Sequence, residues 1–451
     1  MEIFPMGRGA ALSFALLLFA SSAGAAVKLP TAPIKRFLLQ NGLQILMAAD
    51  SGMPVVDVQV WYHVGSKDER PGRTGFAHLF EHLMFDGTRN LGPEQFSSYI
   101  VRAGGIDNAY TTEDATVFWE TLPSADLPVA LWLEADRMRN LQITESTFQN
   151  EREVVEEERR QRFDNQPYGN VMGELYSQAF SASPYRHLPI GSMKDLAHAS
   201  VRDVQSFYDT YYVPNNATVV LAGNFDEAQA LKRVQQYFGP LSPGKIPVPR
   251  DYPKEPPQKA EHKLKLAQDV ALPAFVEGYH MPADGTPDSY PLRLAAKILA
   301  DGESSWIYRR LVYEKQMAMQ VESEGNFTEL PNLFFIFAVM NPGHTPAQGE
   351  AEVSAILDRL KRGDISSRDL ERAKNETLRD VILNRQTAQN RADELGYDTV
   401  ILKDPDLYNS AMSYFLSLTA SDIQRVAQKY FTPRNLTLVE VEPESVEAKN
   451  R

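Results

Sequence analysis

Two histidines and a glutamate early in the chain have the types and spacing of a metal-dependent hydrolytic site. In the segment His78-Leu79-Phe80-Glu81-His82, the histidines are four residues apart. On a helix, residues at this spacing project from one face, so both ring nitrogens can reach the same ion. Glu81 lies close to that face and is placed to act as a general base toward water. Because imidazole and carboxylate are usual zinc donors, the segment predicts one Zn²⁺ per chain.

A catalytic zinc site needs a third protein ligand, and the acidic run at residues 151–158 (EREVVEEE) could supply it. Most of these glutamates also fit a solvated helix face. Spacing leaves Glu156, Glu157 and Glu158 as contenders for the ligand. Glu151 and Glu158 are two helical turns apart on one face, so one could bind the metal while the other supports it. The alternative for the whole set is a surface helix with ordinary ion pairs between His and Glu.

Helices and strands must position these side chains. Residues 75–84 have helical composition, and residues 127–141 place apolar side chains on one helical face. Residues 53–64 and 115–122 are β-branched and aromatic with partial alternation, which is typical of strands. Because strands and helices mix without a regular β-α-β-α rhythm, the pattern indicates α+β domains.

The chain contains two similar halves. Residues 200–220 and 419–439 share a polar helix start, an aromatic pair, a proline and an asparagine, at a constant offset of 219. A second match aligns residues 78–87 with 293–302 at an offset of 215. Two matches in the same order predict duplication of a domain of about 200 residues.

A proline-rich segment separates the two copies. Residues 239–259 hold seven of the 29 prolines and follow no helical or strand period. We therefore predict a linker at 239–261 between a zinc-binding domain at 27–238 and a homologous domain at 262–451. In the second domain the two histidines and the glutamate are replaced by Arg293, Lys297 and Ala296.

The N-terminus has the three parts of a secretory signal peptide. Arg8 precedes the apolar run at residues 10–20, and Ala23-Gly24-Ala25 fits a small-x-small cleavage pattern. We expect residues 1–26 to be removed on export, most simply to a bacterial periplasm. The chain has no cysteine, so its core rather than disulfides must stabilise it there.

The composition excludes other classes of protein. A net charge of −13 without a basic run gives no electrostatic footprint for nucleic acid. The apolar run near the N-terminus is too short to span a bilayer, and no other stretch comes close. The sequence therefore indicates neither nucleic-acid binding nor a membrane span.

The segment His78-Leu79-Phe80-Glu81-His82, together with residues 151–158, resembles the pitrilysin/insulinase family of zinc metallopeptidases (inverzincins), whose metal-binding motif is His-x-x-Glu-His. The resemblance covers the mature chain and is closest to the processing-peptidase-like branch, whose chains have two homologous domains, each a mostly antiparallel sheet packed with helices. It implies Glu158 as the third ligand and Glu151 as its supporting partner. It also implies that a peptide or unfolded polypeptide adds to a sheet edge, where Asn108 and Ala109 stand in this sequence.

One departure from the family concerns two residues of the later half. Relatives carry an Arg and a Tyr seven residues apart that reach the bound peptide, whereas this chain has Val312 and Met319. Neither side chain can donate a hydrogen bond to a developing oxyanion. Tyr313, next to Val312, is an alternative donor.

Three functions follow from these observations. We predict a zinc endopeptidase that acts as the catalytic subunit of a heterodimer, with a homologous partner supplying the Arg/Tyr pair. The first alternative is a non-catalytic structural or assembly subunit of the same family. The second is a zinc-dependent hydrolase of a non-peptide substrate.

Overall fold

The computed structural model describes residues 31–444, so the predicted signal peptide at residues 1–26 lies outside the described residues. From Ala32 onward the described chain forms one compact unit. None of the helices in this part combines the length and the hydropathy that a membrane-spanning helix requires.

Six strands from the first half form one sheet in the order β1-β2-β6-β3-β5-β4. β2 and β6 are parallel, and all other neighbours are antiparallel. Every residue of β3 after Val55 is buried, because helices cover both faces of this central strand. The strands are β1 (Lys35–Leu38), β2 (Gln44–Ala49), β3 (Val55–Tyr62), β4 (Ile106–Thr111), β5 (Thr116–Pro123) and β6 (Ala217–Gly223).

Five strands from the second half form a sheet in the order β7-β11-β8-β10-β9. β7 and β11 are parallel and the other neighbours antiparallel, so this sheet repeats the first one without β1. The prediction of two homologous α+β halves with mostly antiparallel sheets is confirmed. The strands are β7 (His262–Gln268), β8 (Ala274–His280), β9 (Ala318–Gly325), β10 (Leu333–Met340) and β11 (Leu436–Pro443).

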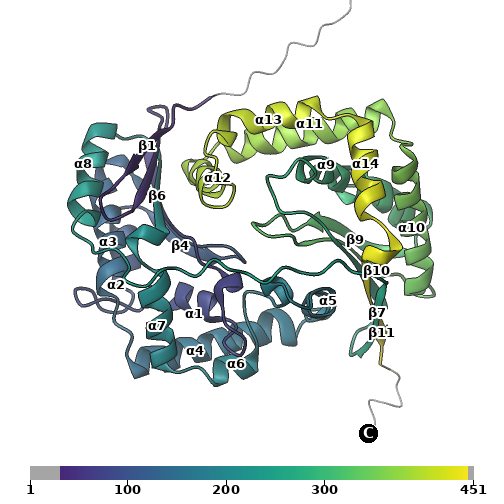
Figure 1. Ribbon diagram of the computed structural model, residues 1–451, viewed down its shortest axis with the longest axis horizontal. Helices are drawn as coiled ribbons and strands as arrows, with labels where there is room; N and C mark the ends of the chain where they lie inside the picture. Colours follow the sequence, from purple (N-terminus) through teal and green to yellow (C-terminus); the bar gives the residue numbers. More distant parts are fainter. Residues whose placement is uncertain (1–30, 445–451) are drawn as a thin grey trace, which may run out of the picture. The chain divides into compact units, whose positions relative to one another are not determined.

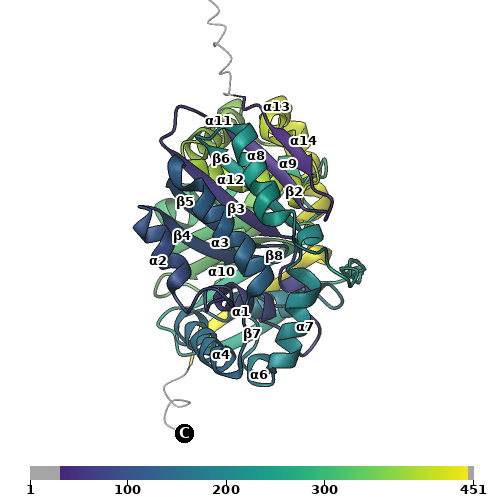
Figure 2. The same cartoon turned by 90° about the vertical axis from the view of Figure 1, so that its left-hand side faces the viewer.

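Helices pack on both sheets, and Figure 2 shows α3 and α8 in front of the first sheet. The helices predicted at 75–84 and 127–141 are α1 and α3. The first half contains α1 (Phe76–Leu83), α2 (Gln95–Arg102), α3 (Leu127–Asn140), α4 (Glu145–Arg159), α5 (Val171–Ala179), α6 (Met193–Ala197), α7 (Val201–Tyr211) and α8 (Glu227–Phe238). The second contains α9 (Ser289–Ala300), α10 (Pro346–Arg362), α11 (Ser367–Asn384), α12 (Ala388–Val400), α13 (Leu407–Ser417) and α14 (Ala420–Tyr430).

The repeated polar residues make the same contacts in both halves. Ser200 caps α7 and Thr419 caps α14, each accepting a hydrogen bond from the backbone three residues on. The side chain of Asn216 donates to Tyr211 O at 2.8 Å, and that of Asn435 donates to Tyr430 O at the same distance. Each asparagine thereby ties the end of its helix to the following strand, which explains why this pattern recurs at a fixed offset.

The two halves exchange helices (Figure 1). α5 of the first half packs on the second sheet, and α12 of the second half packs on the face of the first sheet that is opposite α3 and α8. Each of these contacts is close because one partner is a glycine. A Cβ at Gly396 of α12 would lie 2.1 Å from Cε2 of Trp61 in β3. A Cβ at Gly278 of β8 would lie 2.9 Å from Cδ1 of Leu175 in α5. Each sheet is therefore buried on a face by the opposite half.

Residues 239–261, the predicted linker, contain no helix or strand. α8 ends at Phe238 and β7 begins at His262. Arg250 in this segment donates to His63 O and to Asn216 Oδ1, both at 2.6 Å, so the segment is fastened to the first half. The domain limits at 27–238 and 262–451 stay predictions.

Candidate metal centre

α1 and α4 bring two histidines and one glutamate together. One ligand atom from each of His78, His82 and Glu158 lies within 4.8 Å of the others. The Nε2 atoms of His78 and His82 are 3.6 and 3.3 Å from the same oxygen, Glu158 Oε2. These separations are longer than good hydrogen bonds and leave space for an ion between the three donors. Two imidazoles and a carboxylate arranged in this way fit Zn²⁺.

The other contenders on α4 point elsewhere. Glu156 pairs with Arg152 and Arg160 at 3.8 and 3.5 Å. Glu157 is 53 % exposed and pairs with Arg160 at 2.9 Å. Among the three glutamates that spacing left open, Glu158 alone lies beside both histidines.

The surroundings shift the pKa values of the two histidines in opposite directions. Burial, with His82 and Arg162 nearby, lowers the pKa of His78 to about 3, so its ring is neutral and can donate a lone pair. Burial alone would also lower the pKa of His82. The hydrogen bond with Glu151 and the carboxylates of Glu158 and Glu81 outweigh burial and raise that pKa.

Glu151, two helical turns before Glu158 on α4, lies beside His82. Its Oε2 is 3.4 Å from His82 Nδ1, opposite the nitrogen that faces Glu158. Such a contact fixes which ring nitrogen is free to bind a metal. Asp86 is a further titratable residue beside Glu151 that the sequence motifs do not identify. Burial and Glu151 raise its pKa to about 7. Its position one helical turn after His82 was the available signal.

Glu81 points toward the end of the edge strand. Thr111 Oγ1 donates to Glu81 Oε2 at 2.7 Å, which leaves the other carboxylate oxygen free of a hydrogen bond to the described residues. Burial raises the pKa of Glu81, and the bond from Thr111 opposes this rise. A carboxylate with a raised pKa holds a proton more readily near neutral pH, as a general base that later acts as an acid must.

A second glutamate, Glu69, holds the helix that carries the histidines. Gly75 begins α1 at a φ of 92°, a conformation that favours glycine, and offers no side-chain cap. The fully buried carboxylate of Glu69 accepts instead from the backbone nitrogens of Gly75 and Ala77 at 2.9 and 2.8 Å. It satisfies two of the free N–H groups at the helix start.

The π-helical turn at Arg160–Asp164 follows α4 directly and aims Arg162 back at the site. Arg162 Nη1 lies 2.7 Å from Glu158 Oε1. One oxygen of Glu158 is thus held by an arginine while the other faces the histidines. In the sequence, only the position of Arg162 four residues after Glu158 indicates this contact, and that signal is weak.

The predicted substrate residues lie on the edge strand β4, which pairs with β5 alone among the described strands. Asn108 is exposed, and its Oδ1 accepts from the nitrogen of Ala109, which is buried. Beside the strand's end, a cavity of about 470 Å³ contains His78 and Glu158 and is bounded from the second half by Glu324 and Asn326.

Val312 and Met319, which stand where relatives carry an Arg and a Tyr, lie away from this cavity. Met319 is 59 % exposed and Tyr313 is 79 % exposed. Val312, Tyr313 and Met319 are absent from the lining of the cavities around the histidines within the described residues. Tyr313 does not replace the missing donor within this chain.

The second copy of the site holds an ion pair in place of metal ligands. α4 and α11 begin after the caps Thr144 and Ser366, an offset of 222 that places Asp380 at the position of Glu158. Lys297, at the position of His82, donates to Asp380 at 2.6 Å and also contacts Asp301. A lysine–carboxylate bridge therefore joins α9 to α11 where His82 and Glu158 face each other in the first copy.

Comparison with known proteins agrees with this geometry. A model of the insulinase family (peptidase family M16) matches residues 44–188, and a model described as the peptidase M16 inactive domain matches residues 198–377. The chain belongs to peptidase family M16. This M16 chain is 33 % identical over 408 residues to the zinc protease PqqE of Helicobacter pylori, covering 90 % of this chain and 92 % of that protein.

More distant M16 relatives extend the comparison. The β subunit of the mitochondrial-processing peptidase of Lentinula edodes is 24 % identical over 421 residues, covering 89 % of this chain and 88 % of that protein. The crystal structure of a protease from Helicobacter pylori superimposes with a TM-score of 0.89 at 32 % identity, over 92 % of this chain and 100 % of that one. The relatives' names thus associate the family with zinc and proteolysis.

Proposed function

We propose that this M16 chain is a zinc-dependent endopeptidase that binds one Zn²⁺ through His78, His82 and Glu158. The observation that carries the proposal is the convergence of three donor atoms within 4.8 Å on two packed helices. When bound there, Zn²⁺ supplies Lewis acidity that polarises a peptide carbonyl and lowers the pKa of a water molecule to about 7.

Glu81 moves the proton in this proposal. Its Oε2 is held by Thr111, so Oε1 is the atom that accepts a proton from the attacking water. Burial, which raises the pKa of Glu81, lets the carboxyl keep that proton until the leaving amine takes it. The raised pKa and the fixed orientation of the carboxylate support this role.

The substrate in this proposal is a peptide or unfolded polypeptide that pairs with the free edge of β4 near Asn108 and Ala109. Main-chain hydrogen bonds to an edge strand require an extended backbone and tolerate many side chains. The unpaired edge of β4 and the adjoining cavity beside His78 support this mode of binding.

We also propose that a homologous subunit completes the site, so that the active enzyme is a heterodimer. The exposure of Met319 and the absence of a hydrogen-bond donor at Val312 support an oxyanion donor from elsewhere. The distant relatives that are named β subunits of processing peptidases support it as well. An exported location, in a periplasm, is proposed from the N-terminal residues alone.

The absence of a hydrogen-bond donor at Val312 and Met319 also favours a second candidate function. In this alternative, the chain is a structural or assembly subunit that binds zinc without cleaving peptides. Glu81→Gln separates the two functions because it keeps the ligands and removes the base. If the chain is a peptidase, the variant retains zinc and loses peptide cleavage, while Glu157→Gln on the exposed side of α4 retains both. Equal cleavage by Glu81→Gln and the native chain would refute the role of Glu81.

The heterodimer is tested separately by measuring peptide cleavage with the purified, zinc-loaded chain alone and with proteins that co-purify from the native source. We expect the chain alone to be nearly inactive and a co-purifying homologous chain to restore cleavage. Cleavage by the isolated chain at an ordinary enzymatic rate, with kcat of about 1 to 10³ s⁻¹, would contradict the heterodimer.

A further inference from the structure

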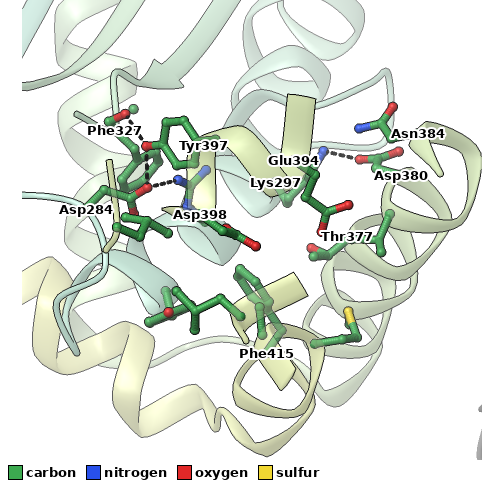
Figure 3. Close-up of a pocket in the computed structure, with 18 of the residues that line it drawn as sticks. Asp284, Lys297, Phe327, Thr377, Asp380, Asn384, Glu394, Tyr397, Asp398 and Phe415 are labelled. Carbon is green, nitrogen blue, oxygen red and sulfur yellow. Dashed lines mark hydrogen bonds and ion pairs between the residues drawn. The ribbon is translucent and has the colours of Figure 1, made fainter. Parts of the chain in front are cut away.

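The second half contains a cavity of about 500 Å³ between α9, the end of β9, and helices α11, α12 and α13 (Figure 3). Arg293 and Lys297, which stand at the positions of the two zinc-binding histidines, line it. The cavity is thus the second copy's counterpart of the space beside the metal ligands. This cavity has Arg293 and Lys297 where the first copy has His78 and His82.

The charged groups of the cavity do not balance. Each of its three cations is paired: Arg293 with Asp284 at 2.6 Å, Lys297 with Asp380 at 2.6 Å, and Arg385 Nε with Glu394 at 2.7 Å. Two further carboxylates, those of Glu324 and Asp398, line the same cavity without a hydrogen bond or ion pair to the described residues. The cavity therefore carries two carboxyl groups beyond those that its own cations neutralise.

Asp398 is the more informative of the two. Its residue is 7 % exposed, so water compensates little of its charge. Burial and the neighbouring Glu394 raise its pKa to about 8, although Arg385 opposes the rise. A carboxyl with little access to water and no partner among the described residues is costly to ionise, and a cation entering the cavity would supply the missing counter-charge.

The remaining wall of the cavity is apolar. Tyr290, Phe327, Leu407, Met412 and Phe415 line it, and the ring of Phe327 already stacks against the Arg293 guanidinium at 3.9 Å. Aromatic faces attract organic cations, and the aliphatic wall suits a methylene stem. Both features favour a cation with an apolar body over a bare metal ion.

We propose that this cavity binds an organic cation, an ammonium or guanidinium group on an apolar stem, with Asp398 and Glu324 as its counter-charges. None of the zinc ligands lines this cavity, although Glu324 also borders the cavity beside His78 and Glu158, and binding there does not depend on peptidase activity. The cation has two possible sources with the same chemistry, a free small amine or a lysine or arginine side chain of a bound polypeptide.

Calorimetric titration of the full chain tests the proposal above pH 8, where the Asp398 carboxyl ionises. The probes are pentylammonium, 1-pentanol and pentanoate, which share a stem and differ in charge. We expect pentylammonium to bind and the other two not to bind. Asp398→Asn should weaken pentylammonium binding at least about tenfold, the loss of one charge-assisted hydrogen bond.

Asp358→Asn, on an exposed position of α10, is the matched control and should leave the affinity within about twofold. Circular dichroism of both variants checks that they fold. Pentanol or pentanoate binding as tightly as pentylammonium, an unchanged affinity in Asp398→Asn, or no heat from pentylammonium at about 10 mM would each overturn the proposal.

The source of the cation is resolved by competition in the Glu81→Gln background, where peptide is not cleaved if Glu81 is the base. An end-blocked pentapeptide with a central lysine either displaces pentylammonium, which assigns the site to polypeptide side chains, or does not, which assigns it to small amines. The norleucine version of the peptide should not compete. Equal competition by the lysine and norleucine peptides would overturn the requirement for charge.

Discussion

The exchange of helices between the halves makes a sharp prediction at Gly396. In Gly396→Ala, the new Cβ would lie 2.1 Å from Cε2 of Trp61, whereas carbon atoms in contact are about 3.5 to 4.0 Å apart. Trp61 is 3 % exposed and its Nε1 donates to Gln59 at 2.7 Å, so the indole has little freedom to retreat. The helix or the strand must move by more than about 1 Å.

Two opposing effects determine how much Gly396→Ala changes the free energy of unfolding. Alanine in place of glycine inside a helix stabilises by about 1 kcal/mol, which favours the variant. Overpacking of a rigid core costs about 1 to 3 kcal/mol and more when backbone must shift. Because the Trp61 ring is rigid, we expect the steric cost to win and the free energy of unfolding to fall by about 2 kcal/mol.

Urea unfolding of the full chain measures the effect, with Gly278→Ala as the matched control from the other half. There the Cβ would meet Leu175 Cδ1 at 2.9 Å, the end of a flexible side chain, so a change below about 1 kcal/mol is expected. Combining Gly396→Ala with Trp61→Leu should give a coupling energy of about 1 kcal/mol or more that favours the double variant. A Gly396→Ala chain at least as stable as the native one would refute the packing described for α12.

Two further predictions concern buried glutamates. Glu69→Ala removes the acceptor for the backbone N–H groups of Gly75 and Ala77. At about 1 to 3 kcal/mol for each buried donor left without a partner, we expect a loss of several kcal/mol in stability, and unchanged urea unfolding would contradict the capping role. For Glu277, burial raises the pKa from 4.5 to about 8, so its stabilising effect is complete below pH 4.5 and is lost as pH rises through 8. Glu277→Gln should therefore gain stability relative to the native chain between pH 5 and pH 8, by up to about 1.4 kcal/mol per pH unit, whereas the exposed variant Glu303→Gln should show no such gain.

The parts that the sequence predicted correctly depend on local spacing. The helix at 75–84, the helix at 127–141 and the strand at 53–64 follow from periodicity, which depends on neighbouring residues only. The same reasoning placed His78 and His82 on one face. Spacing alone left the third ligand open, and the family resemblance selected Glu158, which the structure brings beside both histidines.

The parts that were missed depend on contacts between distant segments. Glu69 lies in a loop without a periodic pattern, and its role appears only when the loop folds under α1. The pairing of Lys297 with Asp380 was hidden because the offset between the copies changes from 215 to 222 along the chain. The exchange of α5 and α12 needs a tertiary arrangement that no local pattern encodes.

The central claim, that α1 and α4 together form a zinc site, is tested most directly by zinc stoichiometry. Zinc content after dialysis against a weak chelator is compared for the native chain, Glu158→Gln and the matched Glu157→Gln, which lies next to it on the exposed face of the same helix. We predict one zinc ion per chain in the native protein and in Glu157→Gln, and loss of zinc from Glu158→Gln. Full retention of zinc by Glu158→Gln, or no zinc in the native chain, would contradict the account.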